Sequence, residues 1–308
     1  MHFKIYFIFI ACIFHCYSKR LNNKQKNIIN IVYALDNKYI DYLYTSLITL
    51  FENSNKNTIY KIYIQVSSNF TTTNKNLIYS LEKRYFNCII TFIDMKNEYR
   101  TAVRGCLDIS TYYRLKLPRL IKNINRIIHI DSDSIIIKDL TELFTLNFEQ
   151  KYILGRLDMI TDELDILGIK TKTYINCGVI LMDLYSLRKF NYTDKFDEYV
   201  TKHNNARYLN HHDQTCINYV CHDKIGIFRP KYHMWPFLGT EEIINFNKKL
   251  RTHYDIQEFI EDYYDPFIVH FPGDYKIKPI YFNTTYYMKF LGYKRLAKLI
   301  KEEINNNY

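Results

Sequence analysis

Several kinds of segment are missing from this 308-residue chain, and each absence removes a class of function. The formal net charge is +10, but the lysines are spread out, with no long basic run and no nucleic-acid-binding motif, so binding to DNA or RNA is not expected. Beyond the N-terminal segment, no apolar run approaches the ~20 residues that a membrane-spanning helix needs. With no internal repeat and no low-complexity linker, the chain is expected to form one large domain or two small ones.

Cysteine is scarce as well. Five of the seven cysteines lie beyond the N-terminal segment, and their scattered spacing suggests neither a zinc site nor a disulfide framework. Cys216 and Cys221 fall on one expected helix, where a bridge between them would be geometrically poor. An odd count in an oxidising compartment implies at least one thiol that is free or paired with another chain.

The first residues have the pattern of a secretory signal, with one early cation followed by a short apolar stretch. Cys16 and Ser18 place small residues at −3 and −1 before Lys19, so we expect residues 1–18 to be a cleaved signal peptide and residues 19–27 a polar leader. The alternative is an uncleaved membrane anchor. The mature chain is expected in the lumen of the secretory pathway (ER or Golgi) or outside the cell.

From residue 28 onward, strand-like and helix-like segments alternate, which is typical of a parallel sheet with crossover helices. The expected strands are residues 28–35, 59–66 and 88–93, and the expected helices are residues 41–51 and 74–85. In such sheets ligands bind beyond the carboxyl ends of the strands, so Asp36 and Asp131 should lie on one rim. Asp36 could equally be a helix N-cap.

After residue 150 the pattern is less regular. The expected elements are a strand at 179–182, a helix at 184–203 and a shorter helix at 213–220, whereas residues 228–250 give no clear pattern. We expect the main domain to span residues 28–282 and the C-terminal segment, residues 283–308, to carry an amphipathic helix at 286–300. Packing of this helix against the domain is favoured over a weak contact with a membrane surface.

Two aspartates, Asp131 and Asp133, interrupt the apolar stretch 126–137, which otherwise has the pattern of a buried strand. Carboxylates at the end of a buried strand need a compensating charge. Because side chains at i and i+2 of an extended segment point the same way, both could hold one divalent cation or face one pocket. An acidic pair of this kind, taken alone, is more often a solvated turn.

A second polar group follows another strand-like run, residues 266–269, far downstream. His270 at the strand end could ligate a metal, although a lone histidine there is more often structural. Gly273 would let the backbone approach a ligand closely, and Lys276 could place a positive charge on a phosphate. Together with the acidic pair, these residues predict an Asp/Asp/His metal site with a cation beside it, which suits the departure of a diphosphate.

Five motifs in the same order make the chain resemble glycosyltransferase family 8 over roughly residues 28–280. They are the strand and turn at 30–39, the segments 110–118 and 174–184, the His-Asp-Gln at 212–214 and the H-x-x-G-x-x-K at 270–276. The resemblance is closer to bacterial lipopolysaccharide galactosyl- and glucosyltransferases than to glycogenin. It implies a GT-A-type α/β fold, Rossmann-like and with a central, mostly parallel sheet. It also implies retaining transfer of galactose or glucose from a UDP-sugar to a hydroxyl of a glycan, lipid-linked or protein acceptor.

The resemblance further implies a role for each motif residue. Asp131, Asp133 and His270 would hold Mn²⁺, for which two oxygen ligands and one imidazole are well suited. Lys276 would stabilise the leaving diphosphate as part of the catalytic centre. The donor would be contacted by Ala34, Asp36, Arg114, Ser132, Asp158, Asn176 and Gly273, with Asp213 and Gln214 at the catalytic centre. Because an amide is a poor nucleophile, front-face attack is preferred over a covalent intermediate on Gln214.

The chain departs from the family pattern at two of these motifs. Lys38 stands where a small polar or acidic residue is common, and Ile277 follows the motif lysine where Pro-Trp is usual, with Lys278 as a second candidate cation. These departures favour the first alternative, a nucleotide-sugar-binding protein without catalysis. A second alternative is an aspartyl-phosphate phosphatase with Asp131 as nucleophile, but such enzymes carry the motif near the start of the domain.

Overall fold

The computed structural model describes residues 26–96, 98–99, 108–159, 163–203, 212–273 and 284–306. The expected signal peptide and almost all of the expected leader lie outside these ranges, as do Lys276 and Lys278. Among the described helices, none is both long enough and apolar enough to cross a membrane.

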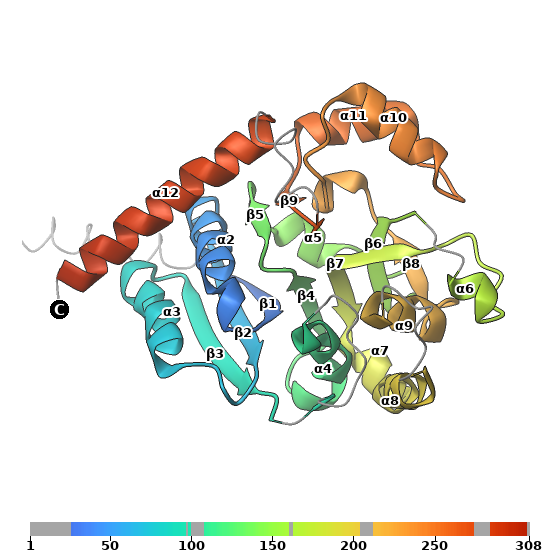
Figure 1. Ribbon diagram of the computed structural model, residues 1–308, viewed down its shortest axis with the longest axis horizontal. Coiled ribbons are helices and arrows are strands. Elements are labelled where there is room, and N and C mark those ends of the chain that lie inside the picture. The colour runs from blue at the N-terminus through green and yellow to red at the C-terminus, as the bar shows by residue number, and fades with distance from the viewer. Residues whose placement is uncertain are drawn as a thin grey trace, which may run out of the picture.

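A seven-stranded sheet with the order β3-β2-β1-β4-β7-β6-β8 forms the centre of the molecule, and β5 and β9 form a separate two-stranded sheet (Figure 1). The strands are β1 (Asn27–Leu35), β2 (Thr58–Val66), β3 (Cys88–Asp94), β4 (Arg126–Ile130), β5 (Ser134–Ile136), β6 (Ile153–Leu157), β7 (Ile175–Asp183), β8 (Ile225–Ile227) and β9 (Ile268–His270). In the large sheet, β7 runs antiparallel to both of its neighbours, and the other neighbouring pairs are parallel. The expected α/β fold with a mostly parallel sheet is therefore confirmed.

Helices cover both faces of the large sheet. They are η1 (Asn37–Tyr39), α2 (Ile40–Glu52), α3 (Thr72–Arg84), η2 (Ile109–Lys116), α4 (Leu117–Leu120), α5 (Thr141–Thr145), α6 (Glu163–Ile166), α7 (Leu184–Lys189), α8 (Tyr192–His203), α9 (His212–Val220), η3 (Pro230–Tyr232), α10 (Thr240–Lys248), α11 (Ile256–Tyr264) and α12 (Thr285–Asn306), where η denotes a 3₁₀ helix. One hydrophobic cluster joins α2 and α3 to the sheet, and another joins η2, α4, α7, α8 and α9 to it. A third cluster joins α10 and α11 to β5 and β9.

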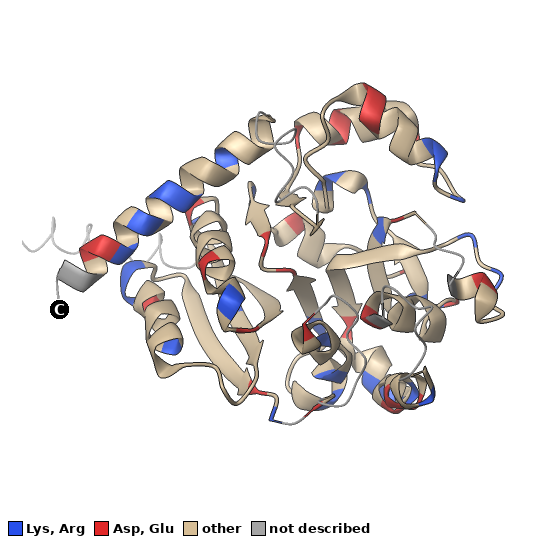
Figure 2. Ribbon diagram, viewed as in Figure 1, with Lys and Arg blue, Asp and Glu red and all other residues tan. Residues whose placement is uncertain are grey.

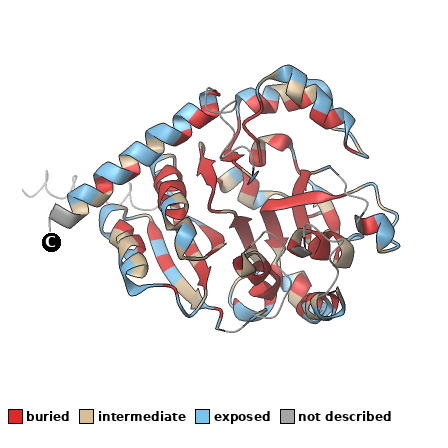
Figure 3. Cartoon of the chain, in the orientation of Figure 1, coloured by how far each residue is buried: buried red, intermediate tan, exposed pale blue. Residues whose placement is uncertain are grey.

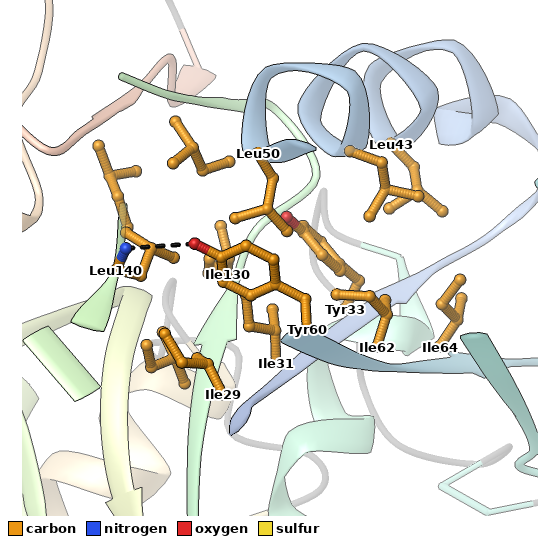
Figure 4. Close-up of a cluster of buried hydrophobic side chains, with 14 of the residues drawn as sticks. Ile29, Ile31, Tyr33, Leu43, Leu50, Tyr60, Ile62, Ile64, Ile130 and Leu140 are labelled. Atoms are coloured by element: carbon orange, nitrogen blue, oxygen red, sulfur yellow. Dashed lines mark hydrogen bonds between the residues drawn. The ribbon is translucent and has the colours of Figure 1, made fainter. Parts of the chain in front are cut away.

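The alternation of side chains along β1 explains why both faces are covered. Ile31 and Tyr33 belong to the cluster with α2, whereas Val32 between them belongs to the cluster on the other face. Figure 4 shows the first cluster, in which the hydroxyl of the buried Tyr60 accepts the backbone N–H of Leu140 at 3.3 Å. Because a buried hydroxyl without a partner would be costly, this bond lets a tyrosine occupy the core.

The apolar stretch 126–137 is not a single strand, which corrects one expectation. β4 ends at Ile130, a turn carries Asp131 and Asp133, and β5 then pairs in the other sheet. Since the two aspartates do not lie on one extended segment, the i, i+2 rule does not explain why their side chains meet.

Two smaller expectations and one of the motifs can also be compared with the structure. The expected helix at 184–203 divides into α7 and α8 around Asn191, which has a φ of +53°. The segment 110–118 is mainly the 3₁₀ helix η2, followed by α4. Four cysteines are described as free and buried, namely Cys88, Cys177, Cys216 and Cys221.

The C-terminal helix α12 runs diagonally along one edge of the molecule and packs against α2 (Figure 1). Ala297 and Ile300 are buried in the cluster that α2 shares with the sheet. The opposite side of the helix is exposed (Figure 3) and carries a row of basic residues (Figure 2). The helix therefore packs back on the domain, as the favoured interpretation of its sequence proposed, and leaves a basic face open.

Candidate functional site

The small sheet brings together two polar motifs that lie far apart in the sequence. Ser134, the first residue of β5, pairs with His270 at the end of β9. The N–H of Phe271 donates to the carbonyl of Asp133 at 3.0 Å, which extends this pairing beyond the strands. On the other side, the N–H of Asp131 donates to the carbonyl of Gly178 in β7 at 2.7 Å. The acidic turn is thus held between the two sheets.

Asp131, Asp133 and His270 form a cluster that could hold a metal ion. One ligand atom from each residue lies within 4.8 Å of the other two. Nε2 of His270 is 3.2 Å from Oδ1 of Asp133 and 3.8 Å from Oδ2 of Asp131. Asp133 and His270 are buried, whereas 31% of the Asp131 side chain is exposed, so the cluster is open to solvent on the Asp131 side.

The second carboxylate oxygen of Asp131 is bound by protein groups. Oδ1 lies 2.9 Å from Nη2 of Arg114 and 3.0 Å from Nε2 of His129. Burial raises the pKa of Asp131, but Arg114 and His129 outweigh burial and lower it well below the ordinary value. Burial and then Arg114 lower the pKa of His129 to about 4, so His129 is neutral at pH 7 and donates its Nε2 proton to Asp131.

Arg114 is the buried cation of the site and is only 4% exposed. Besides contacting Asp131, its Nε lies 3.3 Å from Oδ2 of Asp213, and its Nη1 donates to the carbonyl of Cys177. The residue comes from η2, whose N-terminus is capped by the side chain of Asp108. Burial raises the pKa of Asp213 to about 6, with Arg114 opposing the rise and Asp131 adding to it. One guanidinium therefore compensates two acidic groups.

The donor set fits a divalent cation. Two carboxylate oxygens and one imidazole nitrogen form a mixed set, whereas Mg²⁺ and Ca²⁺ favour oxygen ligands throughout. Arg114 and His129 hold one oxygen of Asp131 while the other faces His270. Nδ1 of His270 contacts His233 at 2.9 Å, so its Nε2 is directed at the carboxylates.

A second polar cluster joins Asp158 and Asn176, which the family resemblance assigns to the donor, with Gln214, which it assigns to the catalytic centre. Nδ2 of Asn176 donates to Oδ2 of Asp158 at 2.8 Å, and Nε2 of Gln214 donates to the same oxygen at 3.3 Å. Oε1 of Gln214 accepts the N–H of Cys177 at 3.1 Å, and Oδ1 of Asn176 accepts the N–H of Gly178 at 2.9 Å. The backbone of β7 and one carboxylate thus fix the orientation of both amides.

One pocket is lined by residues of both clusters. The lining includes ten residues singled out by the motifs, namely Ala34, Arg114, Asp131, Ser132, Asp133, Asn176, Asp213, Gln214, His270 and Gly273. Asp158 is not part of the lining, but it accepts hydrogen bonds from Asn176 and Gln214, which are. Asp36 caps η1 and accepts the N–H of Lys38 at 2.8 Å, the helix-capping role that its sequence position left open. Lys276 lies outside the described residues.

Two histidines of the site were not expected from the sequence. His129 lies two residues before Asp131, so strand alternation together with the hydrogen-bonding capacity of imidazole was a usable signal. His233 follows η3 in the segment 228–250, where the sequence shows no clear period. Only tertiary pairing with β9 brings His233 to His270, and no local pattern indicates that pairing.

Comparisons with known proteins identify the family and the fold of the chain. The chain matches the family described as glycosyl transferase family 8 over residues 30–279. It is 25% identical over 296 residues to general stress protein A of Bacillus subtilis (strain 168), covering 92% of this chain and 99% of that protein. The structure of the galactosyltransferase LgtC with donor and acceptor sugar analogues has a TM-score of 0.69 at 17% identity, covering 86% of this chain and 95% of that one.

A second solved structure, the bifunctional glycosyltransferase WbbM, has a TM-score of 0.66 at 17% identity. It matches 88% of this chain, which spans about half, 52%, of that longer protein. These likenesses concern the fold, which is that of the GT-A glycosyltransferases. On the evidence of its sequence match and its fold, the chain belongs to glycosyl transferase family 8.

Proposed function

We propose that the protein is a retaining enzyme that transfers a hexose, galactose or glucose, from a UDP-sugar to a hydroxyl acceptor with Mn²⁺. The observation that supports this most is the pocket shared by the Asp131–Asp133–His270 cluster and the amides of Asn176 and Gln214. The first group suits a cation bound to a diphosphate, and the second offers donors and acceptors to sugar hydroxyls. The acceptor would be a glycan, a lipid-linked sugar or a protein hydroxyl.

Release of UDP from a panel of UDP-sugars in the presence of Mn²⁺ tests this activity and identifies the donor. We expect one hexose donor to release UDP slowly by hydrolysis without an acceptor, and faster by transfer of the hexose when an acceptor is present. A panel in which no UDP-sugar releases UDP, while the protein still binds UDP, would favour a binding protein without catalysis.

The residues of the pocket suit front-face attack. Mn²⁺ would supply Lewis-acid stabilisation of the leaving diphosphate. Arg114 holds one oxygen of Asp131 at 2.9 Å and so keeps that carboxylate in one orientation. Asn176 and Gln214, each already fixed by backbone groups, would orient the donor sugar. The leaving phosphate can accept the proton of the incoming hydroxyl, so no nucleophilic side chain is needed.

The stereochemical outcome tests the mechanism. We expect an α-linked product from an α-linked UDP-sugar, detected by NMR of the anomeric coupling. Oε1 of Gln214 already accepts the N–H of Cys177 at 3.1 Å, which makes this weakly nucleophilic amide a poor candidate for a covalent sugar adduct. Gln214→Ala should therefore keep measurable activity. A β-linked product would contradict the retaining assignment.

The positive charge expected beside the metal is assigned to Lys276 by its spacing from His270. Lys276→Ala should lower turnover by about 2–4 kcal/mol of transition-state stabilisation, the scale for losing an electrostatic contact to a developing anion. Lys278→Ala serves as the matched control and should have a much smaller effect. Steady-state kinetics of the two variants decide the point, and the reverse order would assign the role to Lys278.

We also propose a weak contact between the exposed face of α12 and anionic lipid. Met288, Leu291 and Leu299 are 57%, 39% and 56% exposed, and Lys294 and Arg295 are exposed beside them. Sedimentation with phosphatidylserine vesicles should fall as salt rises, and the double substitution Lys294→Glu with Arg295→Glu should weaken it further. Sedimentation of the wild type with neutral vesicles to the same extent as with phosphatidylserine vesicles would count against this contact. Equal sedimentation of the wild type and the double variant with phosphatidylserine vesicles would do so as well.

A further inference from the structure

A buried histidine stands directly behind the proposed metal ligand His270. Nε2 of His233 lies 2.9 Å from Nδ1 of His270, and the ring centroids are 5.1 Å apart. The two residues are 0% and 3% exposed, respectively. Because both rings are buried from bulk water, the hydrogen-bond partners of their ring nitrogens are determined by the surrounding protein groups.

Backbone pairing fixes this contact. The N–H of Met234 donates to the carbonyl of Ile268 at 2.9 Å, and the N–H of His270 donates to the carbonyl of Met234 at 2.8 Å. Met234 and Val269 also form an isolated parallel bridge. These bonds therefore hold the backbone of His233, directly before Met234, alongside β9.

The other side of the His270 ring is bounded by the backbone of β7. A Cβ at Gly178 would lie 2.3 Å from Cε1 and 2.6 Å from Nδ1 of His270. Those distances are too short for any side chain, so glycine is required for the ring to occupy this place. Between Gly178 and His233, the imidazole has little freedom to rotate.

His233 can accept a hydrogen bond from His270 only when its own ring is neutral. A neutral imidazole keeps one bare nitrogen that can accept a hydrogen bond, and an imidazolium has none.

We propose that His233 is a positioning residue for metal binding: its Nε2 accepts the Nδ1–H of His270 and so presents the lone pair on Nε2 of His270 to the cation. This inference rests on the proposed metal-dependent function. In the opposite arrangement His233 would donate, and the proton of His270 would sit on Nε2, 3.2 Å from Asp133, where it would block coordination. The partner that fixes the tautomer of a ligating histidine typically changes metal affinity 10–100-fold.

Metal affinity measured without nucleotide tests the role independently of turnover. Electron paramagnetic resonance of free Mn²⁺, titrated with the full chain, gives the dissociation constant. His233→Phe keeps a ring of similar size but removes the acceptor, and should weaken Mn²⁺ binding about 10–100-fold. His233→Gln offers an amide oxygen close to the place of Nε2 and should recover most of the affinity. His253→Phe, whose ring nitrogen contacts the carbonyl of Asn247 instead, should bind as the wild type does.

Two results would overturn the proposal. One is an unchanged affinity in His233→Phe, and the other is binding in His233→Gln as weak as in His233→Phe, which would indicate packing alone. If His233→Phe does not fold, His233→Asn replaces it, because its shorter amide cannot reach Nδ1 of His270. Weaker binding in His233→Asn than in His233→Gln supports the proposal, and equal binding refutes it. Absence of Mn²⁺ binding by the wild type would instead refute the metal assignment itself.

Discussion

Asp133→Asn is expected to abolish Mn²⁺-dependent UDP release, or to lower it by at least about 10²–10³-fold, the scale for losing one preorganised electrostatic group. The asparagine has nearly the same shape, but it no longer contributes a negative charge 3.2 Å from Nε2 of His270. The fold should survive, because the carbonyl of Asp133, not its carboxylate, accepts the N–H of Phe271. Coupled-enzyme detection of UDP measures the loss.

The metal can be separated from the fold by thermal unfolding. Mn²⁺ should raise the Tm of the wild type, since a ligand that binds only the folded state stabilises it, and should raise that of Asp133→Asn much less. Asp165→Asn is the matched control, because Asp165 is an aspartate on α6 that pairs with Arg251 instead. Full activity in Asp133→Asn, or wild-type activity undiminished in EDTA, would contradict the metal-site assignment.

The first three strands could be predicted from the local sequence, whereas β6 and β8 were not expected. The edges of β1, β2 and β3 match the expected strands to within one residue, since each is a short run rich in β-branched and aromatic residues and helical segments separate them. The acidic turn could not be placed in this way. Apolar residues continue on both sides of it, yet β4 belongs to one sheet and β5 to another, which is a tertiary choice.

The candidate site, too, could be predicted from the sequence only in part. Asp131, Asp133 and His270 could be grouped from the sequence because each carries metal-binding chemistry at the end of an apolar run, and the structure places them together. His233 could not be grouped with them, because its role depends on a ring nitrogen 2.9 Å away on another segment. The hydrogen bond from the N–H of Cys177 to Gln214 likewise depends on the packing of α9 against β7.

Arg114→Leu should cost about 3–5 kcal/mol of folding free energy at pH 7, the scale for leaving buried charge uncompensated. The guanidinium is 4% exposed and contacts Asp131 at 2.9 Å and Asp213 at 3.3 Å. Its loss therefore removes the positive charge that compensates both carboxylates. Arg114→Lys should be milder but still destabilising, because an ammonium cannot reproduce the separate contacts of the planar group.

The pH dependence distinguishes lost charge compensation from lost packing. In the wild type the pKa of Asp131 is below its reference of 3.8, so its ionisation contributes stability above that pH, and this contribution is lost as pH falls towards the folded pKa. In Arg114→Leu both carboxyl pKa values should rise, so the destabilisation should be largest at pH 7 and shrink as the pH is lowered towards 4 and both groups become protonated. Urea unfolding of wild type and variant at several pH values measures the difference.

Arg188→Leu is the control for this experiment. Its guanidinium donates to the carbonyls of Ile121 and Ile124 and to no carboxylate among the described contacts, so its deficit should not change with pH over the same range. An Arg114→Leu deficit that is equally independent of pH would mean that Arg114 stabilises by packing and by its bond to the carbonyl of Cys177. In that case the acidic pair at the end of β4 would have to be stabilised chiefly by the hydrogen bond from the neutral His129 and by a bound cation.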